Sequence, residues 1–154
     1  MSRPEPSEGD LIRHAGLIAI RLGGFWRGVL IEGPPGAGKS DLALRALEQG
    51  FCLVADDRVL LWTSGGRLYG RAPDPLAGLL EVRGLEVARV PALPLAEVAL
   101  VARCGAAERI PDPRRAEIAG VSLPLVEIDP REASAPAKLR RALDHFDVGG
   151  KRRI

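Results

Sequence analysis

The sequence has few cysteines, no excess of charge of one sign and no long hydrophobic run. Cys52 and Cys104 are isolated and lack CxxC spacing, so neither a zinc site nor a disulfide framework is indicated. The 22 Lys and Arg residues nearly balance the 20 Asp and Glu residues. Such a balance excludes the strongly basic class of nucleic-acid-binding proteins and is too weak for a membrane-surface protein.

Targeting segments are also missing from the pattern. No uncharged apolar run approaches the roughly 20 residues of a membrane-spanning helix, and the first ten residues are polar, without the apolar core of a secretory signal. We therefore expect a reduced, cytoplasmic protein without nucleic-acid or membrane partners. The 154 residues favour one domain with its own core, which we predict over residues 11–148, after a flexible N-terminus (1–10) and before a basic tail (149–154).

Short strands and two helices are predicted by the hydrophobic pattern. Two strands flank a Gly23–Gly24 turn, and an apolar stripe at helical spacing predicts a helix over Ser40–Gln49. Ser134 is a candidate N-cap for a final helix. Further strands are expected at Phe51–Ala55, Arg58–Trp62, Arg67–Arg71, Glu97–Ala102 and Leu123–Ile128, with a short helix within Pro73–Leu80 and a glycine-interrupted segment at Glu81–Val90. This mixture predicts the α/β class, with a mixed sheet and flanking helices.

The strongest local motif is a complete GxxxxGK[ST] pattern between a predicted strand and a predicted helix. Glycines in such a loop let backbone N–H groups turn towards phosphate oxygens, the lysine reaches the outer phosphates, and the serine hydroxyl can ligate Mg²⁺. The helix that follows adds its positive end. The nucleotide-binding candidates are Gly33, Pro34, Pro35, Gly36, Ala37, Gly38, Lys39 and Ser40.

Two adjacent carboxylates, Asp56 and Asp57, follow the next predicted strand. Neighbouring side chains on an extended chain point in opposite directions. One carboxylate could therefore serve Mg²⁺ while the other accepts a proton. A solvated turn is the simpler interpretation of two aspartates, but a strand end soon after a phosphate loop favours a functional role. Asp129, at the end of another strand, ranks below Asp57 because it lies far along the chain.

Taken together, these pieces resemble the kinase domain of HPr kinase/phosphorylase, over roughly residues 11–100. The resemblance is carried by the phosphate loop and by three further segments, whose order and spacing both match. These segments are His14-Ala15-Gly16-Leu17, Leu53-Val54-Ala55-Asp56-Asp57 and Leu80-Glu81-Val82-Arg83-Gly84-Leu85. The resemblance implies a P-loop fold akin to that of phosphoenolpyruvate carboxykinase, in the short form found in some proteobacteria, and a hexameric assembly.

The resemblance also implies roles for individual residues. His14 falls at the family's active-site histidine, and Asp57 at the carboxylate that acts as general base in phosphorylation and general acid in the reverse reaction. Lys39 and Ser40 fall at the phosphate and Mg²⁺ contacts. Asp56, from the residue pattern, and Glu81, from the resemblance, complete the expected metal set. Glu81, Arg83 and Gly84 open a signature segment linked to both activities, and Arg114, Arg115 and Arg131 are candidates for a later catalytic arginine.

The function that we expect is ATP-dependent phosphorylation of a serine on HPr or an HPr-like phosphocarrier of the bacterial phosphotransferase system. The reverse reaction would be attack of inorganic phosphate on the phosphoserine, which releases pyrophosphate. Phosphoryl transfer needs positioning, charge neutralisation and an oriented nucleophile, which Lys39, Ser40 with Mg²⁺, and Asp57 could supply. Two alternatives stay open, a small-molecule kinase and a nucleotide-sensing module without catalysis.

Overall fold

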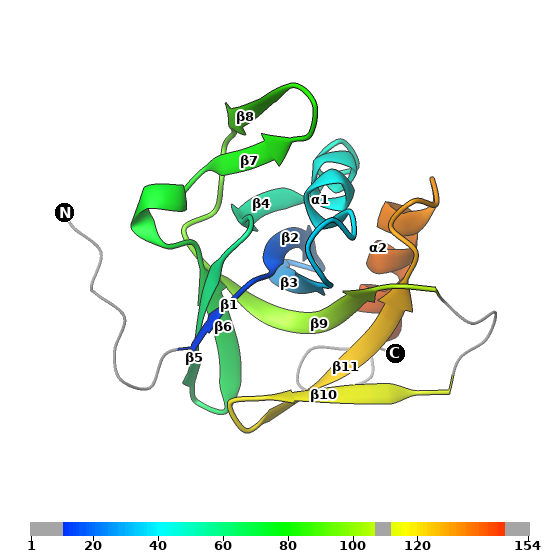
Figure 1. The fold of residues 1–154 in the computed structure, drawn as a ribbon. Coiled ribbons are helices and arrows are strands. Elements are labelled where there is room, and N and C mark those ends of the chain that lie inside the picture. Colours follow the sequence, from blue (N-terminus) through cyan, green and yellow to red (C-terminus); the bar gives the residue numbers. More distant parts are fainter. Residues whose placement is uncertain (1–10, 107–111, 147–154) are drawn as a thin grey trace.

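A strongly curled mixed sheet with two helices on one face forms the fold (Figure 1). The computed structural model describes residues 11–106 and 112–146. The predicted flexible N-terminus and basic tail lie outside these ranges. The main sheet contains β1 (Leu11–Arg13), β2 (Gly16–Leu22), β3 (Phe25–Glu32), β4 (Cys52–Ala55), β5 (Val59–Ser64), β6 (Arg67–Arg71), β9 (Ala96–Cys104), β10 (Arg114–Ile118) and β11 (Val121–Ile128).

Outside the main sheet lie two helices, one short 3₁₀ turn and a separate hairpin. The helices are α1 (Lys39–Leu47) and α2 (Ala135–His145), and the 3₁₀ turn is η1 (Asp74–Leu76). The hairpin is formed by β7 (Leu79–Val82) and β8 (Glu86–Arg89), which pair only with each other among the described strands. It stands apart from the main sheet, at the top of Figure 1 beside α1.

Four strands direct their carboxyl ends to one edge of the sheet. β3 is parallel to β9, and β9 is parallel to β11. β2 is antiparallel to both β3 and β4, so β4 also runs in the direction of β3. The chain segments after β3, β4, β9 and β11 therefore emerge together, which is the edge where ligands bind in sheets of this kind.

Two hydrophobic clusters fill the two faces of the sheet. One lies between the sheet and the helices and includes Leu42 of α1 and Leu139 of α2. The other lies inside the curl and includes Leu30, Leu61 and Leu123 from strands that face one another. Alternation along β3 sends Ile31 to the first cluster and Leu30 to the second. This two-sided burial fixes the position of the loop that leaves β3.

Most of the predicted elements are confirmed, with small shifts of their ends. The β2–β3 pair turns at Gly23–Gly24, whose φ angles of 60° and 83° suit glycine. The first helix begins one residue earlier than predicted and ends at Leu47. Ser134 does precede α2, but its side chain makes no capping hydrogen bond.

The short helix expected within Pro73–Leu80 is present as the 3₁₀ helix η1, and the last two residues of this segment already belong to β7. Two other features were not predicted. Glu81–Val90 is part of a hairpin, because Gly84 adopts a φ of 80° at its turn. β1 and β10 were missed, since their side chains are mostly exposed or half-buried and give no apolar run.

Candidate phosphoryl-transfer site

The phosphate loop, residues 33–40, connects the carboxyl end of β3 to α1. Gly36 and Gly38 have φ angles of 78° and 102°, a region that strongly favours glycine. A Cβ at Gly38 would also lie 3.3 Å from the ring of Pro130. Gly38 caps the helix without a side-chain hydrogen bond. The N–H groups of the first helical turn are therefore left for a ligand, at the positive end of the helix dipole.

Lys39 lies along this loop. Its Nζ donates to the carbonyl oxygens of Gly33 at 2.7 Å and of Pro34 at 3.0 Å. These contacts hold the ammonium group against the loop backbone, and no acidic side chain of residues 11–106 or 112–146 is hydrogen-bonded to it. A phosphate oxygen carries more negative charge than a carbonyl oxygen, so it would compete well for this cation.

Asp56 is buried, with 6% of its surface exposed, and both of its carboxylate oxygens accept hydrogen bonds. The hydroxyl of Ser40 donates to Oδ1 at 2.8 Å, and the main-chain N–H of Glu81 donates to Oδ2 at 3.0 Å. The carboxylate therefore joins α1, the end of β4 and β7 at one point. Such complete pairing is what allows a charged group to be buried at this position.

Asp57 differs from Asp56 in its backbone conformation and in the exposure of its side chain. Its φ is 69°, and the Arg58 N–H donates to the Asp56 carbonyl at 2.8 Å, which together describe a γ-turn. A left-handed φ is uncommon outside glycine, although Asp tolerates it better than most residues. The Asp57 side chain is 70% exposed, and its carboxylate lies 3.9 Å from Nε of Arg58. The turn presents this carboxylate to solvent.

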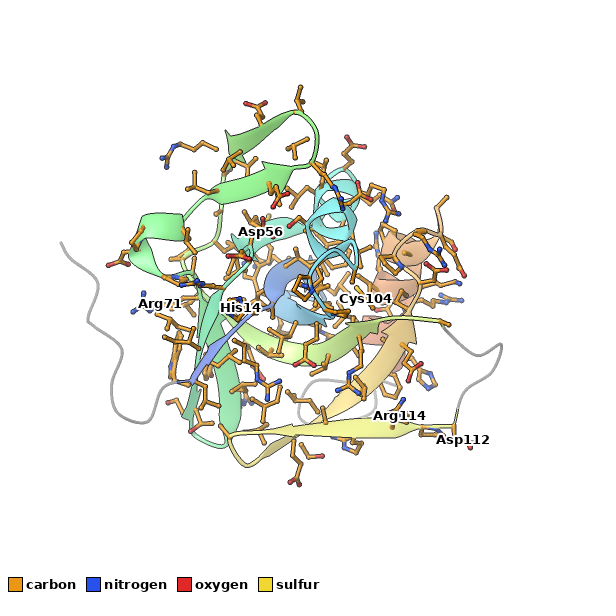
Figure 2. The ribbon with its side chains drawn as sticks, in the orientation of Figure 1. His14, Asp56, Arg71, Cys104, Asp112 and Arg114 are labelled. Atoms are coloured by element: carbon orange, nitrogen blue, oxygen red, sulfur yellow. The ribbon has the colours of Figure 1, made fainter. Side chains whose placement is uncertain are left out.

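His14 lies opposite this γ-turn. β1 pairs with β5 through Arg13 and Val59, and β2 pairs with β4 through Leu17 and Ala55. The link from β1 to β2 carries exposed His14, and the link from β4 to β5 carries the two aspartates. Since β1 pairs with β5 and β2 pairs with β4, these two links run side by side. His14 and Asp56 are both labelled in Figure 2.

A network that the sequence did not reveal supports this region. Arg13 Nη1 donates to Glu32 Oε1 at 2.5 Å, and Arg103 Nη2 lies 3.6 Å from Glu32 Oε2. Glu32 is the residue before the phosphate loop, and Arg103 is its register partner on β9. The network ties the segment next to His14 to the root of the loop. Its one sequence signal was the charged residue Glu32 at the end of an apolar strand.

The signature residues lie on the hairpin. Glu81 reaches Asp56 through its main-chain N–H, while its own carboxylate is exposed, as are Arg83 and Gly84 at the turn. Within residues 11–106 and 112–146, no group of three or more His, Cys, Asp or Glu side chains is close enough to hold a metal ion. A metal at this site would need few protein ligands.

Two oxygen donors, Ser40 and Asp56, are already in place for such a metal. Mg²⁺ takes oxygen ligands, keeps several waters and is commonly held by one or two carboxylates together with substrate phosphates. The donor set therefore fits Mg²⁺ bound with a nucleotide. It does not form a closed cage of protein ligands.

The carboxyl ends of β9 and β11 complete the edge. Cys104 lies under the loop, since a Cβ at Gly33 would be 3.0 Å from its Cβ. Burial raises the pKa of the Cys104 thiol, and nearby Lys39 opposes this.

The Arg131 guanidinium donates to Asp129 at 3.1 Å, and this hydrogen bond lowers the pKa of the Asp129 carboxyl. Arg45 of α1 donates to the Glu132 carbonyl at 2.9 Å and also to the Pro130 carbonyl, which fastens the β11–α2 link to α1.

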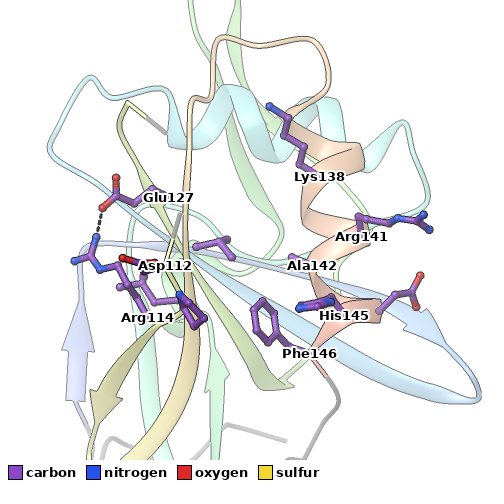
Figure 3. A pocket seen from close by; sticks show the side chains of 12 residues that line it. Asp112, Arg114, Glu127, Lys138, Arg141, Ala142, His145 and Phe146 are labelled. Atoms are coloured by element: carbon purple, nitrogen blue, oxygen red, sulfur yellow. Dashed lines mark hydrogen bonds and ion pairs between the residues drawn. The ribbon is translucent and has the colours of Figure 1, made fainter. Parts of the chain in front are cut away.

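A separate cleft of about 830 Å³ lies between the β10–β11 pair and α2 (Figure 3). It is lined by β10, β11 and the side of α2, and no residue of the phosphate loop lines it. Arg114, a candidate for the later catalytic arginine, lines the cleft and pairs with Glu127. Arg115 instead bonds Ser122 on β11, at 2.7 Å from its Oγ. The structure does not bring either arginine together with Asp57 through a hydrogen bond or an ion pair among the described residues.

The fold and the loop define the class of this protein as a P-loop domain with a mixed α/β sheet. Residues 11–93 match the family model of the HPr Serine kinase C-terminal domain, and the chain belongs to that family. The chain resembles HPr kinase/phosphorylase of Clostridium tetani, with 47% identity over 66 residues, which is 43% of this chain and 22% of that protein. It also resembles the enzyme of the same name from Mycoplasmopsis pulmonis, with 40% identity over 72 residues, 47% of this chain and 22% of that protein.

A solved structure supports the fold over a longer range. The Hpr(Ser) kinase/phosphatase from Coxiella burnetii matches with a TM-score of 0.74 at 24% sequence identity, covering 88% of this chain and 95% of that chain. The predicted α/β fold of the HPr kinase type is thereby confirmed. The aligned part of this chain spans about a fifth of the length of the curated relatives. In the ranges that the structure describes, no helix is both long and apolar enough to cross a bilayer.

Proposed function

We propose that this domain is an ATP-dependent serine-protein kinase that acts on HPr or an HPr-like phosphocarrier of the bacterial phosphotransferase system. The observation that carries the proposal is a 2.8 Å hydrogen bond from Ser40, in the first turn of α1, to buried Asp56. It occurs in a chain of the HPr kinase family. The names of the relatives support HPr as the acceptor. A cytoplasmic location and the hexameric assembly implied by the resemblance are part of the same proposal.

The loop would bind the phosphates of ATP. Backbone N–H groups of residues 33–40 and the N-terminal turn of α1 would donate to phosphate oxygens, and Lys39 would exchange its two carbonyl contacts for the outer phosphates. Ser40 and Asp56, with the Glu81 carboxylate as a third candidate, would hold Mg²⁺. The ion would neutralise charge on the phosphates.

Asp57 would handle the proton. Its exposed carboxylate would accept the proton of the acceptor serine as that oxygen attacks the γ-phosphorus, and ADP would leave. The γ-turn supports this role, because it displays Asp57 towards solvent while Asp56 stays on Ser40. His14, on the opposite link, would contact the acceptor or the transferred phosphate.

The reverse direction uses the same groups. An oxygen of inorganic phosphate would attack the phosphorus of the phosphoserine, the bond from phosphorus to the serine oxygen would break, and pyrophosphate would form. Asp57 would return its proton to the serine oxygen, as microscopic reversibility requires.

Transfer of label tests the proposal. The protein is incubated with γ-labelled ATP, Mg²⁺ and purified HPr, and the label is located by electrophoresis and by peptide mass spectrometry. We expect label on a serine of HPr, and none with the Lys39→Ala variant. Label found only in free phosphate or in small metabolites would reject the proposal and favour an ATPase module or a small-molecule kinase.

A further inference from the structure

Within the described ranges, one face of the β7–β8 hairpin packs on the core. Leu80 is fully buried against the core, and its register partner Ala88 shares that inward face. Glu81 and Val87 are also register partners, so they share the opposite, outward face. The hydrogen bond from the Glu81 N–H to Asp56, at 3.0 Å, fixes the hairpin to the carboxylate that also holds Ser40.

Two large apolar side chains are exposed on this hairpin. Leu85 is 76% exposed and Val87 is 64% exposed. A two-stranded hairpin has little stability by itself, so these exposed side chains do not stabilise it. Gly84, with a φ of 80° and no atom within 4 Å of an added Cβ, makes the turn that displays Leu85. Exposed apolar residues with a polar border are typical of protein–protein contacts.

Charges around these two residues narrow the kind of partner. Glu81, Arg83, Glu86 and Arg89 are all exposed on the hairpin and balance in sign. A polyanionic partner such as a nucleic acid or an acidic membrane would need a net positive surface. A folded protein, which offers both apolar groups and charges of both signs, fits this border.

We infer that the outer side of the β7–β8 hairpin is the surface on which the phosphoacceptor protein docks, with Leu85 and Val87 as its apolar anchors. The inference rests on the proposed function. A protein whose serine reaches Asp57 must cover the ground next to the γ-turn, and the hairpin borders it through the contact between Glu81 and Asp56. The acceptor would therefore bind to the hairpin whose Glu81 N–H donates to Asp56, the proposed metal-binding carboxylate.

The opposite end of β3 offers a matched control. Phe25 is 68% exposed at the start of β3, whereas the phosphate loop follows the end of this strand. At about 3.3 Å per residue, the two ends of β3 are roughly 25 Å apart. Substitution of Phe25 removes a similar exposed apolar group without touching the hairpin.

The test compares Leu85→Asp, Val87→Asp and Phe25→Asp with the wild type. For each protein, the affinity for HPr is measured by titration in the presence of Mg-ADP, the KM for HPr by label transfer, and the affinity for Mg-ATP by calorimetry. We expect both hairpin variants to weaken HPr binding and raise the KM at least about tenfold, as loss of a central apolar anchor does. Affinity for Mg-ATP should stay unchanged, and Phe25→Asp should match the wild type throughout.

Other outcomes would overturn the inference. Wild-type values for both hairpin variants would show that the acceptor does not use this surface. Dissociation of a wild-type oligomer by Leu85→Asp, measured by light scattering, would assign the surface to a second copy of the chain. Wild-type protein that binds HPr without labelling it would reject the proposed function alone, and the binding data would still decide the docking surface. Wild-type protein that does not bind HPr would reject both.

Discussion

The floor and the rim of the candidate site are built differently. We call Lys39, Ser40 and Asp56 the floor, and His14, Asp57 and the carboxylate of Glu81 the rim. Every floor side chain is held by hydrogen bonds at 2.7–3.0 Å within the protein. The rim side chains are exposed, and the nearest ion pair of Asp57 is 3.9 Å long.

This difference indicates which kind of substrate each region is suited to bind. A prearranged floor suits a small, highly charged ligand, because no ordering of side chains is then needed on binding. An exposed rim suits a second, larger substrate that supplies the missing contacts and excludes water when it arrives. The comparison predicts that changes in the floor act on nucleotide binding and stability, whereas changes in the rim act on the transfer step.

The largest effect is expected in the rim. Asp57→Asn keeps the left-handed turn accessible, since Asn tolerates it as well as Asp, but removes the basic oxygen. General acid–base catalysis contributes about 10²–10⁴-fold, so phosphorylation of HPr should slow by that factor. Single-turnover measurements with saturating Mg-ATP check this. Where the wild type also runs the reverse reaction, slowing of only one direction would contradict a shared base.

The next largest effect is expected in the floor. Lys39→Ala removes a cation that would face the phosphates, which should weaken Mg-ATP binding by about 2–4 kcal/mol. Far-ultraviolet circular dichroism should be unchanged, because the partners of the lysine among the described residues are carbonyl oxygens of the loop itself. Calorimetry measures the affinity, and an unchanged dissociation constant would remove Lys39 from the site.

Stability should separate the two aspartates. Asp56→Ala leaves the Ser40 hydroxyl and the Glu81 N–H without their buried acceptor, which should lower the free energy of unfolding by about 1–3 kcal/mol. Asp57→Asn, at an exposed position, should change it by no more than about 0.5 kcal/mol. Urea unfolding of the two variants gives both values. Equal losses would mean that floor and rim are not distinct.

The smallest effect concerns Cys104 under the loop. Its pKa is raised by burial, so the folded state resists ionisation of the thiol. The unfolded chain then releases this proton at a lower pH than the folded chain, and stability falls as pH rises above the ordinary thiol pKa of about 8.5. Cys104→Ala should show a shallower loss of stability between about pH 8 and 10. An identical pH profile would show that the thiol is not screened from water.

The sequence predicted the floor better than the rim. The phosphate loop is a local motif, and its glycines, its strand and its helix all lie within a short stretch, so periodicity was enough to place it. The different orientations of Asp56 and Asp57 were expected from an extended chain. The structure does place one on Ser40 and the other in solvent, but through a γ-turn in which Asp57 has a φ of 69°.

Long-range features could not be read in the same way. The tie between Arg13, Glu32 and Arg103 spans three strands, and the use of a main-chain N–H by Asp56 leaves no trace in residue identity. The β7–β8 hairpin was missed because its outer residues are apolar and exposed, which disturbs the usual alternation. The roles of His14 and the Glu81 carboxylate stay predictions.

The most direct test of the division between floor and rim is the affinity of the protein for Mn²⁺ in the presence of ADP, measured by electron paramagnetic resonance as a probe of the proposed Mg²⁺ site. The wild type, Asp56→Asn and Asp57→Asn are compared at equal nucleotide saturation. We expect Asp56→Asn to weaken Mn²⁺ binding by at least about tenfold, as loss of a charged ligand does, and Asp57→Asn to bind Mn²⁺ like the wild type. Equal weakening by both variants, or weakening by Asp57→Asn alone, would contradict the account.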